Sequence, residues 1–215
     1  MIAIIDYGAG NLGSVYKAFK FVGADIQVTD SRDVVRDADA LVLPGVGAFT
    51  HCMNGLEGVG LTESTKEFIR SGRPFLGICV GLQMLFDESE EMGQSPGLGI
   101  LPGRVKRFEF EPKKEENGQS TANGRLKVPH IGWNELRFRE DAALFKRLRQ
   151  GDRVYFVHSY YPEPEDRSIV TSVTDYGGTI CCAVEKDNIH ATQFHPEKSG
   201  STGLAILRNF AALST

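Results

Sequence analysis

The first half of the chain alternates short apolar runs with segments of helical periodicity, and this alternation constrains the fold more than any other feature. A strand, a crossover helix and a second strand form a right-handed unit, so the pattern predicts a mostly parallel sheet flanked by helices. The expected strands are Ile2–Ile5, Ile26–Val28, Leu41–Leu43 and Phe75–Ile78. The expected helices are Leu12–Val22, Leu61–Ser71 and Val80–Phe86.

The second half has a different pattern, in which strand-like runs are separated by turn residues. It predicts an antiparallel section joined to the parallel sheet, so the expected fold class is mixed α/β. The expected elements are strands at Arg153–Val157, Ile169–Val173, Thr179–Glu185 and Ile189–Phe194 and a final helix at Gly203–Leu213. A chain of 215 residues is typical of one domain, and we expect residues 1–215 to form it. The polar segment 111–125 is expected to be a mobile surface loop.

Composition argues against several classes of function. Lys plus Arg number 24 and Asp plus Glu number 28, for a net charge of -4, which argues against nucleic-acid or anionic-membrane binding. The N-terminus enters a strand pattern directly, without the features of a signal peptide, and no apolar run approaches the length of a membrane span. The four cysteines lack metal or disulfide spacing, so we expect no metal site and a reducing, cytoplasmic location.

A cysteine occupies the centre of Gly77-Ile78-Cys79-Val80-Gly81, which has the G-x-nucleophile-x-G frame of a strand-to-helix elbow. Glycines on either side of it allow a sharp turn without a Cβ clash, so the thiol is expected to stand exposed at the end of the strand. Cys79 is therefore a candidate nucleophile. Taken alone, such a cysteine is more often a buried residue that packs as a small apolar side chain.

The segment His195-Pro196-Glu197 supplies a possible base for that nucleophile. Residues two apart in an extended segment point to the same side, so His195 and Glu197 can lie next to each other. Pro196 cannot donate to a strand ladder, so pairing stops there. A carboxylate beside an imidazole fixes its tautomer, and the imidazole can then take a proton from a thiol. The tripeptide alone is weak evidence, but with Cys79 it predicts a Cys–His–Glu triad.

A thiolate that attacks a carbonyl group needs donors for the resulting oxyanion. One is expected to be the backbone N–H of Val80, directly after the nucleophile. The other is expected from the glycine-rich loop Pro44–Phe49, where Val46 and Gly47 follow a predicted strand. That loop could also be an ordinary connection between a strand and a helix.

The segment Gly8–Gly13 satisfies the G-x-G-x-x-G pattern between a strand and a helix, with Asp30 after the second strand. This is the outline of a dinucleotide-binding motif. A polar step, Asp6-Tyr7, separates the strand from the glycines, and a redox cofactor would leave the triad unexplained. The alternative is a contact loop on the strand-end surface that carries Cys79.

The combined motifs resemble the class I, triad-type glutamine amidotransferase family. The resemblance rests first on Gly77–Gln83 and His195–Glu197. It implies that Cys79 attacks the side-chain amide of glutamine, that His195 protonates the leaving ammonia, and that Glu197 orients the imidazole.

The resemblance also implies that Gln83 holds the substrate, helped by Ser159 and Tyr160, and that no cofactor takes part. Without that resemblance, Gln83 could be an ordinary solvent-facing residue of a helix.

Further segments are similar to one branch of the family, whose members pass ammonia to a separate (βα)8-barrel cyclase in histidine biosynthesis. That partner makes imidazole glycerol phosphate and aminoimidazole carboxamide ribotide. The segments are Asp6–Asn11, Pro44–Phe49, Pro129–Asn134, His158–Tyr160 and Gln193–Ser199. Positions matching the family's partner interface are Asn11, Trp133, Asn134 and Lys198. The resemblance therefore implies a heterodimer, although Trp133 could be an ordinary core aromatic.

Two other functions remain open at this point. The chain could be a glutaminase that serves another acceptor, such as an anthranilate or pyridoxal-phosphate synthase. It could also be a nucleotide-binding or thiol-regulatory module without catalysis.

Overall fold

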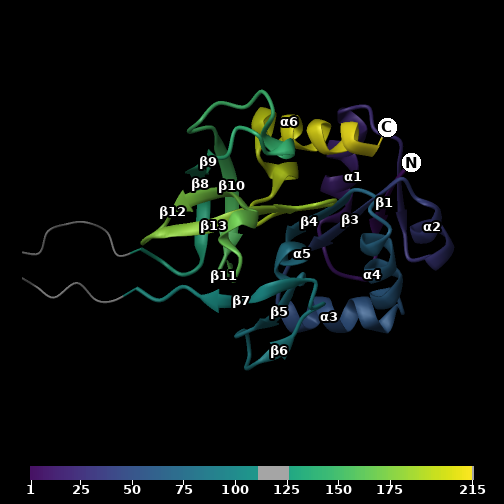
Figure 1. Cartoon of the computed structure of the whole chain (residues 1–215), viewed down its shortest axis with the longest axis horizontal. Coiled ribbons are helices and arrows are strands. Elements are labelled where there is room, and N and C mark those ends of the chain that lie inside the picture. The colour runs from purple at the N-terminus through teal and green to yellow at the C-terminus, as the bar shows by residue number, and fades with distance from the viewer. Residues whose placement is uncertain (111–125, 215) are drawn as a thin grey trace, which may run out of the picture.

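The computed structural model describes residues 1–110 and 126–214. The predicted surface loop 111–125 lies outside the described residues, and the assignment of residues 1–215 to one domain stays a prediction. The centre of the molecule is an eight-stranded sheet in the order β2-β1-β3-β4-β14-β13-β12-β9 (Figure 1). Its strands are β1 (Ile2–Ile5), β2 (Ile26–Thr29), β3 (Ala40–Gly45), β4 (Phe75–Cys79), β9 (Arg137–Phe138), β12 (Val170–Asp175), β13 (Thr179–Lys186) and β14 (Ile189–Thr192).

The five strands β2-β1-β3-β4-β14 run parallel. Every residue of β1, β3 and β4 is buried, as expected for strands covered on both faces by helices. The helices are α1 (Leu12–Phe21), α2 (Arg32–Asp37), α3 (Phe49–Gly58), α4 (Thr62–Arg70), α5 (Val80–Gln83) and α6 (Gly200–Ala211). Helices α1 and α6 cover one face of the sheet, while α3 and α4 cover the other, with α2 against α4 (Figure 1).

Strand β14 is the boundary between the two halves of the sheet. It is parallel to β4 on one side and antiparallel to β13 on the other, and β12 and β9 continue the antiparallel section. This confirms the mixed α/β fold. The strand predicted at Arg153–Val157 is confirmed as β10 (Arg153–His158), which pairs antiparallel with β8 (His130–Glu135). The expectation that it joins the large sheet was wrong, because β10 and β8 form a separate two-stranded sheet.

A third, four-stranded sheet lies in the order β11-β7-β5-β6. Its strands are β5 (Phe86–Ser89), β6 (Ser95–Pro96), β7 (Leu101–Arg107) and β11 (Tyr160–Pro164). The helix predicted over Val80–Phe86 therefore ends early, at Gln83, because tertiary hydrogen bonds replace helical ones. Leu98 N–H donates to Met84 O (2.8 Å), and Leu101 N–H donates to Leu85 O (2.9 Å). Residues 80–86 are all buried, so their pattern could not separate a helix from a strand.

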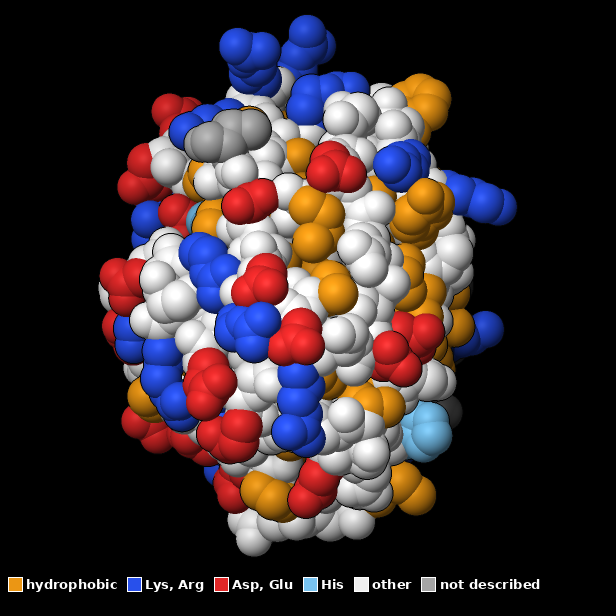
Figure 2. Space-filling view, turned by 90° about the vertical axis from the view of Figure 1, so that its right-hand side faces the viewer, with side chains coloured by type: hydrophobic (Ala, Val, Ile, Leu, Met, Phe, Trp, Pro, Cys, Tyr) orange, Lys and Arg blue, Asp and Glu red, His pale blue; other side chains and the backbone are white. Residues whose placement is uncertain are grey.

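Acidic and basic side chains are interspersed over the end of the molecule that carries α2 (Figure 2). Arg36 lies 2.7 Å from Asp33 and 2.9 Å from Asp37 in exposed ion pairs there. Such a surface has no single sign of charge with which to attract a polyanion. Within residues 1–110 and 126–214, no helix combines the length and the apolar character that crossing a membrane requires.

Candidate active site

Cys79 ends β4 in a strained backbone conformation, with φ 56° and ψ -109°. The flanking glycines make this turn possible: a Cβ on Gly77 would lie 2.7 Å from Gly81 O, and one on Gly81 would overlap the Leu43 carbonyl oxygen. The sharp elbow is therefore present. The expected exposure is wrong, because Cys79 is only 4% exposed. Neighbouring segments of the protein cover the thiol.

The fold brings His195 to Cys79 through the neighbouring strands β14 and β4, in which Thr192 pairs with Ile78. His195 Nδ1 lies 2.8 Å from Glu197 Oε1, and both side chains are almost completely buried. Pro196 opens a 3-10 turn, η3 (Pro196–Lys198), that folds the carboxylate back onto the ring. Two contacts hold the His195 backbone: its N–H donates to Tyr155 O (3.0 Å), and Ser199 Oγ donates to His195 O (2.6 Å).

Two opposing effects act on the pKa of the His195 imidazole. Burial by itself lowers the pKa of His195, but the negative charges of Cys79 and Glu197 outweigh it and raise the pKa to about 10. The Nε2 atom of His195 is buried and makes no hydrogen bond within the described residues. Since Nδ1 is held by Glu197, Nε2 is the atom left to exchange a proton with a reacting group.

Two glutamines form a hydrogen-bonded pair, and one of them contacts the sulfur of Cys79. Gln193 Nε2 lies 3.7 Å from Cys79 Sγ, and Gln83 Nε2 donates to Gln193 Oε1 (3.0 Å) and to Tyr160 O (3.0 Å). Gln83 is 3% exposed, so it is not a solvent-facing residue. Ser159, before Tyr160, connects β10 to β11 beside it. Sequence reasoning missed Gln193, although it stands two residues before the predicted base.

The glycine-rich loop begins next to the nucleophile, since Gly45 of β3 pairs with Cys79 of β4. Tyr7 Oη donates to Pro44 O (2.6 Å), and Cys52 Sγ donates to Val46 O (3.4 Å). Gly47 has φ +89°, in the left-handed region that glycine adopts most readily. Val80 opens α5, so its N–H is one of the first-turn donors that lack a helical acceptor.

Two further contacts fix the surroundings of that loop. Glu91 Oε2 accepts from Phe49 N–H (2.6 Å) at the start of α3, a role that the sequence analysis did not find. Gly10 has φ +114°, and a Cβ there would touch the ring of Pro44. Gly10 of the glycine motif 8–13 thus lies against Pro44, on the same edge as Cys79.

The four predicted interface positions differ in their surroundings. Trp133 is 52% exposed, so it is not a core aromatic; its ring centroid lies 6.2 Å from that of Tyr155. Lys198 Nζ lies 6.0 Å from the same tyrosine ring. Asn11 precedes α1, which packs against η3, and its side chain makes no capping hydrogen bond. Asn134 is instead turned toward its own chain, donating to Asp175 O (3.0 Å).

An acyl-transfer centre is what this arrangement can form: a thiol on a strained elbow, a buried imidazole–carboxylate pair beside it, and a glycine-rich loop along its edge. Within the described residues, no group of three or more His, Cys, Asp or Glu side chains could hold a metal ion. Fold and site together are those expected of a cysteine-dependent hydrolase or transferase built on an α/β sheet.

The chain belongs to the class I glutamine amidotransferase family, whose sequence model, "Glutamine amidotransferase class-I", matches residues 3–213. It is similar to proteins named "Imidazole glycerol phosphate synthase subunit HisH". The relative from Syntrophotalea carbinolica is 55% identical over 98% of this chain and 98% of its own length. The relative from Methanothermobacter thermautotrophicus is 50% identical over 99% of this chain and 98% of its own length.

Solved structures share the fold at low sequence identity. One described as a glutamine amidotransferase superposes with a TM-score of 0.72 at 18% identity, covering 100% of this chain and 99% of that one. At this identity the likeness supports the fold alone, which agrees with the predicted class.

Proposed function

We propose that this protein is a glutaminase subunit that hydrolyses glutamine to glutamate and ammonia through Cys79, His195 and Glu197. The observation that carries the proposal is the strained Cys79 elbow beside the His195–Glu197 pair, whose nitrogen and oxygen lie 2.8 Å apart. The family and the names of the close relatives support the choice of glutamine as the substrate.

In the proposed reaction, the Cys79 thiolate attacks the carbonyl carbon of the glutamine side chain. Backbone N–H groups of Val80 and of the loop residues Val46 and Gly47 stabilise the oxyanion. The His195 imidazolium gives its Nε2 proton to the amide nitrogen, and ammonia leaves. Water then attacks the glutamyl thioester while His195 takes its proton, which releases glutamate and restores the thiolate.

Gln83 is proposed to contact the substrate together with Ser159 and Tyr160. Both amide hydrogens of Gln83 are used within the protein, by Tyr160 O and Gln193 Oε1. Its Oε1 makes no hydrogen bond with the described residues and is the atom left to accept one from a ligand.

The ammonia is proposed to pass to a (βα)8-barrel cyclase subunit that makes imidazole glycerol phosphate and aminoimidazole carboxamide ribotide in histidine biosynthesis. Close relatives are named as subunits of imidazole glycerol phosphate synthase, and an exposed apolar face fits a protein partner. That face lies on β8, which pairs with β10 and in which Ile131 is 59% and Trp133 is 52% exposed. Lys198 in η3, and Asn11 directly before the helix α1 that packs against η3, are proposed to extend this face.

Localisation in the reducing cytoplasm is part of the proposal. It is supported by Cys52, Cys79, Cys181 and Cys182, all of which are free thiols.

The direct test measures glutamate release by the purified chain, with and without the cyclase and its acceptor ligand. We expect slow turnover alone and stimulation by the partner, because the Pro44–Phe49 loop must present its donors. Cys79→Ala should abolish glutamine-dependent synthesis and leave synthesis from added ammonium salts intact. A Cys79→Ala variant that still uses glutamine would refute the mechanism. Recovery of a different synthase in a pull-down would refute the partner.

A further inference from the structure

We infer that the buried histidines His130 and His158 are positioning residues for the glutamine site, acting through the carbonyl group of Tyr160 on Gln83. The inference rests on the proposed glutaminase function and adds two residues to it. His158 Nδ1 lies 2.9 Å from Tyr160 O, the same oxygen that accepts from Gln83 Nε2 at 3.0 Å. His130 Nδ1 lies 3.1 Å from His158 Nε2. The two rings therefore continue the polar contacts that begin at the nucleophile.

The direction of each hydrogen bond in this chain follows from the chemistry of its ends. A carbonyl oxygen only accepts, so His158 Nδ1 carries the proton and its Nε2 is an acceptor. His130 Nδ1 must then donate to that nitrogen, which leaves His130 Nε2 as an acceptor in turn. Asn134 Nδ2, 3.4 Å away, is the donor that faces it. One arrangement of tautomers satisfies every contact.

The surroundings keep both rings neutral. Burial lowers the pKa of His130 to about 4. Burial also lowers the pKa of His158 to about 3. The hydrogen bond to Tyr160 O opposes this shift but does not outweigh it, and the electrostatic effects of His130 and His195 act in the same direction as burial. The neighbours are mainly aromatic: the centroid of Phe156 lies 4.6 Å and that of Tyr176 3.9 Å from His130. A proton added to either ring would break the donor–acceptor order of the chain.

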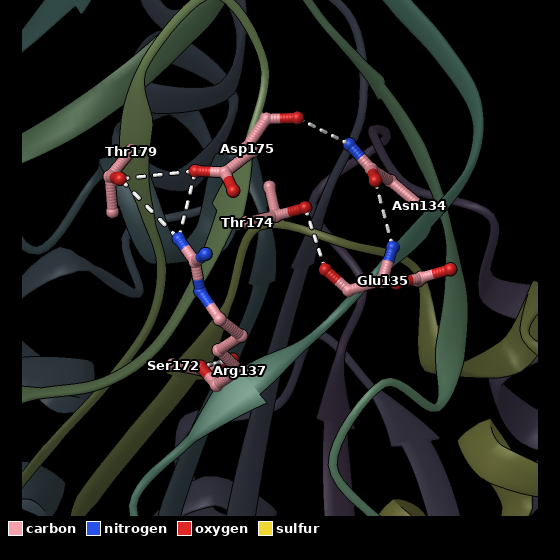
Figure 3. A network of polar contacts seen from close by, with 7 residues as sticks. All are labelled: Asn134, Glu135, Arg137, Ser172, Thr174, Asp175 and Thr179. Carbon is pink, nitrogen blue, oxygen red and sulfur yellow. Dashed lines mark hydrogen bonds and ion pairs between the residues drawn. The ribbon is translucent and has the colours of Figure 1, made fainter.

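The outer end of the hydrogen-bonded chain is Asn134, which is fixed by strands of two different sheets. Figure 3 shows Asn134 on β8 with its nitrogen directed at the backbone oxygen of Asp175 on β12. Its Oδ1 accepts from Glu135 N–H (2.8 Å), so the amide cannot flip without losing both contacts. Thr174 Oγ1 donates to Glu135 O (2.8 Å) beside it. The donor that faces His130 is thus held in one orientation.

The inner end of the hydrogen-bonded chain, at Tyr160 and Gln83, is connected to Cys79 through Gln193. Tyr160 O receives two donors, one from His158 and one from Gln83, so its position depends on both. Gln83 in turn holds Gln193, whose Nε2 lies 3.7 Å from Cys79 Sγ. Loss of the His158 donor would leave the carbonyl group, and with it the Gln83 amide, free to shift. The expected consequence is weaker glutamine binding, with the elbow at Cys79 unchanged.

The test compares His158→Asn with His158→Gln in the full-length chain. The amide nitrogen of Asn can take the place of Nδ1 and donate to Tyr160 O, whereas that of Gln reaches the place of Nε2 and cannot. The measurement is alkylation of Cys79 by iodoacetamide, followed by mass spectrometry of its peptide, with increasing glutamine as the protecting ligand. We expect the half-protecting glutamine concentration to rise about tenfold in His158→Gln and to stay within about twofold of wild type in His158→Asn.

The matched control is Phe108→Leu, which changes the packing against His158, at a ring distance of 5.2 Å, but removes none of the hydrogen bonds between Tyr160, His158, His130 and Asn134. It should leave the half-protecting concentration unchanged, and alkylation without glutamine should proceed at one rate in all variants. Equal behaviour of His158→Asn and His158→Gln would overturn the inference. Wild-type protein that glutamine does not protect would instead refute the proposed function.

The tautomers give an independent decision if the variants do not fold or glutamine does not bind. Long-range ¹⁵N–¹H NMR spectra of the wild-type imidazoles should show both His130 and His158 protonated at Nδ1 and neutral near pH 7. A His158 ring protonated at Nε2 would remove the link to Tyr160 and overturn the inference.

Discussion

Two buried histidine sites in this molecule show opposite electrostatics. His195 faces the carboxylate of Glu197 and the sulfur of Cys79, and its pKa is raised to about 10 although burial opposes this. His130 and His158 face each other and aromatic rings, and burial lowers their pKa values to about 4 and about 3. All three residues are at most 6% exposed, so burial alone does not decide the charge state. The neighbouring charges make His195 suited to proton transfer and leave the other two as fixed hydrogen-bonding groups.

The largest expected effect comes from removing the carboxylate that distinguishes the two sites. In Glu197→Gln the His195 imidazolium loses the charged group that stabilises it. The neutral His195 ring also loses the group that fixes its tautomer. We expect kcat for glutamate release to fall by about 10²- to 10⁴-fold. Steady-state assays with the cyclase present measure this.

The matched control is Glu185→Gln, because Glu185 Oε2 also lies beside a buried imidazole, 3.3 Å from His190 Nδ1. His190 pairs with Leu76, at the opposite end of β14 from His195. Turnover in the control should stay close to wild type. An equal loss in both variants would mean that the Glu197 effect is general destabilisation.

The sequence predicted more of the charged site, formed by Cys79, His195 and Glu197, than of the neutral site, formed by His130 and His158. The reasons are physical. Cys79 is marked by the glycines its turn requires, and His195 and Glu197 are two residues apart in an extended segment, where neighbours can be inferred. Likewise, β1, β3 and β4 are continuous apolar runs because both of their faces are covered.

The remaining features depend on contacts between distant segments. Gln193 meets Cys79 only because β14 lies beside β4, and His130 meets His158 only through the register of β8 with β10. Nothing local distinguishes those histidines from any others in half-buried strands. The burial of the Cys79 thiol likewise depends on segments that the fold brings over it.

The next effect concerns stability on the acid side. The unfolded state binds protons at His130 and His158 near pH 6.5, whereas the folded state resists protonation until about pH 4 and about pH 3. Stability is therefore present above pH 6.5 and is lost as the pH falls below it. The loss should reach at most about 2 kcal/mol for each histidine between pH 6.5 and 5. Urea unfolding at several pH values measures it, and His158→Asn should give a shallower dependence.

His195 provides the contrast within the same experiment, because its shift has the opposite sign. Its folded pKa of about 10 lies above the unfolded value, so its contribution is fully present below pH 6.5 and is lost as the pH rises through about 10. Cys79→Ala removes the first cause that raises this pKa and should move the alkaline loss to lower pH. If Cys79→Ala altered the acid loss of stability instead, it would be wrong to assign the acid loss to His130 and His158 and the alkaline loss to His195.

The smallest expected effect tests whether surface charge controls the position of the neutral histidines His130 and His158. Arg137 and Asp175 form an ion pair of 2.8 Å next to Asn134 (Figure 3), with side chains 56% and 61% exposed. Solvent screens such a pair, so Arg137→Ala should change the free energy of unfolding by no more than about 0.5 kcal/mol. Asn134 is held by the backbone oxygen of Asp175 and not by its carboxylate, so the NMR signals of the His130 ring should also stay in place. A shift of those signals would mean that the ion pair controls the outer end of the chain. The neutral site would then depend on charge as the Cys79 site does.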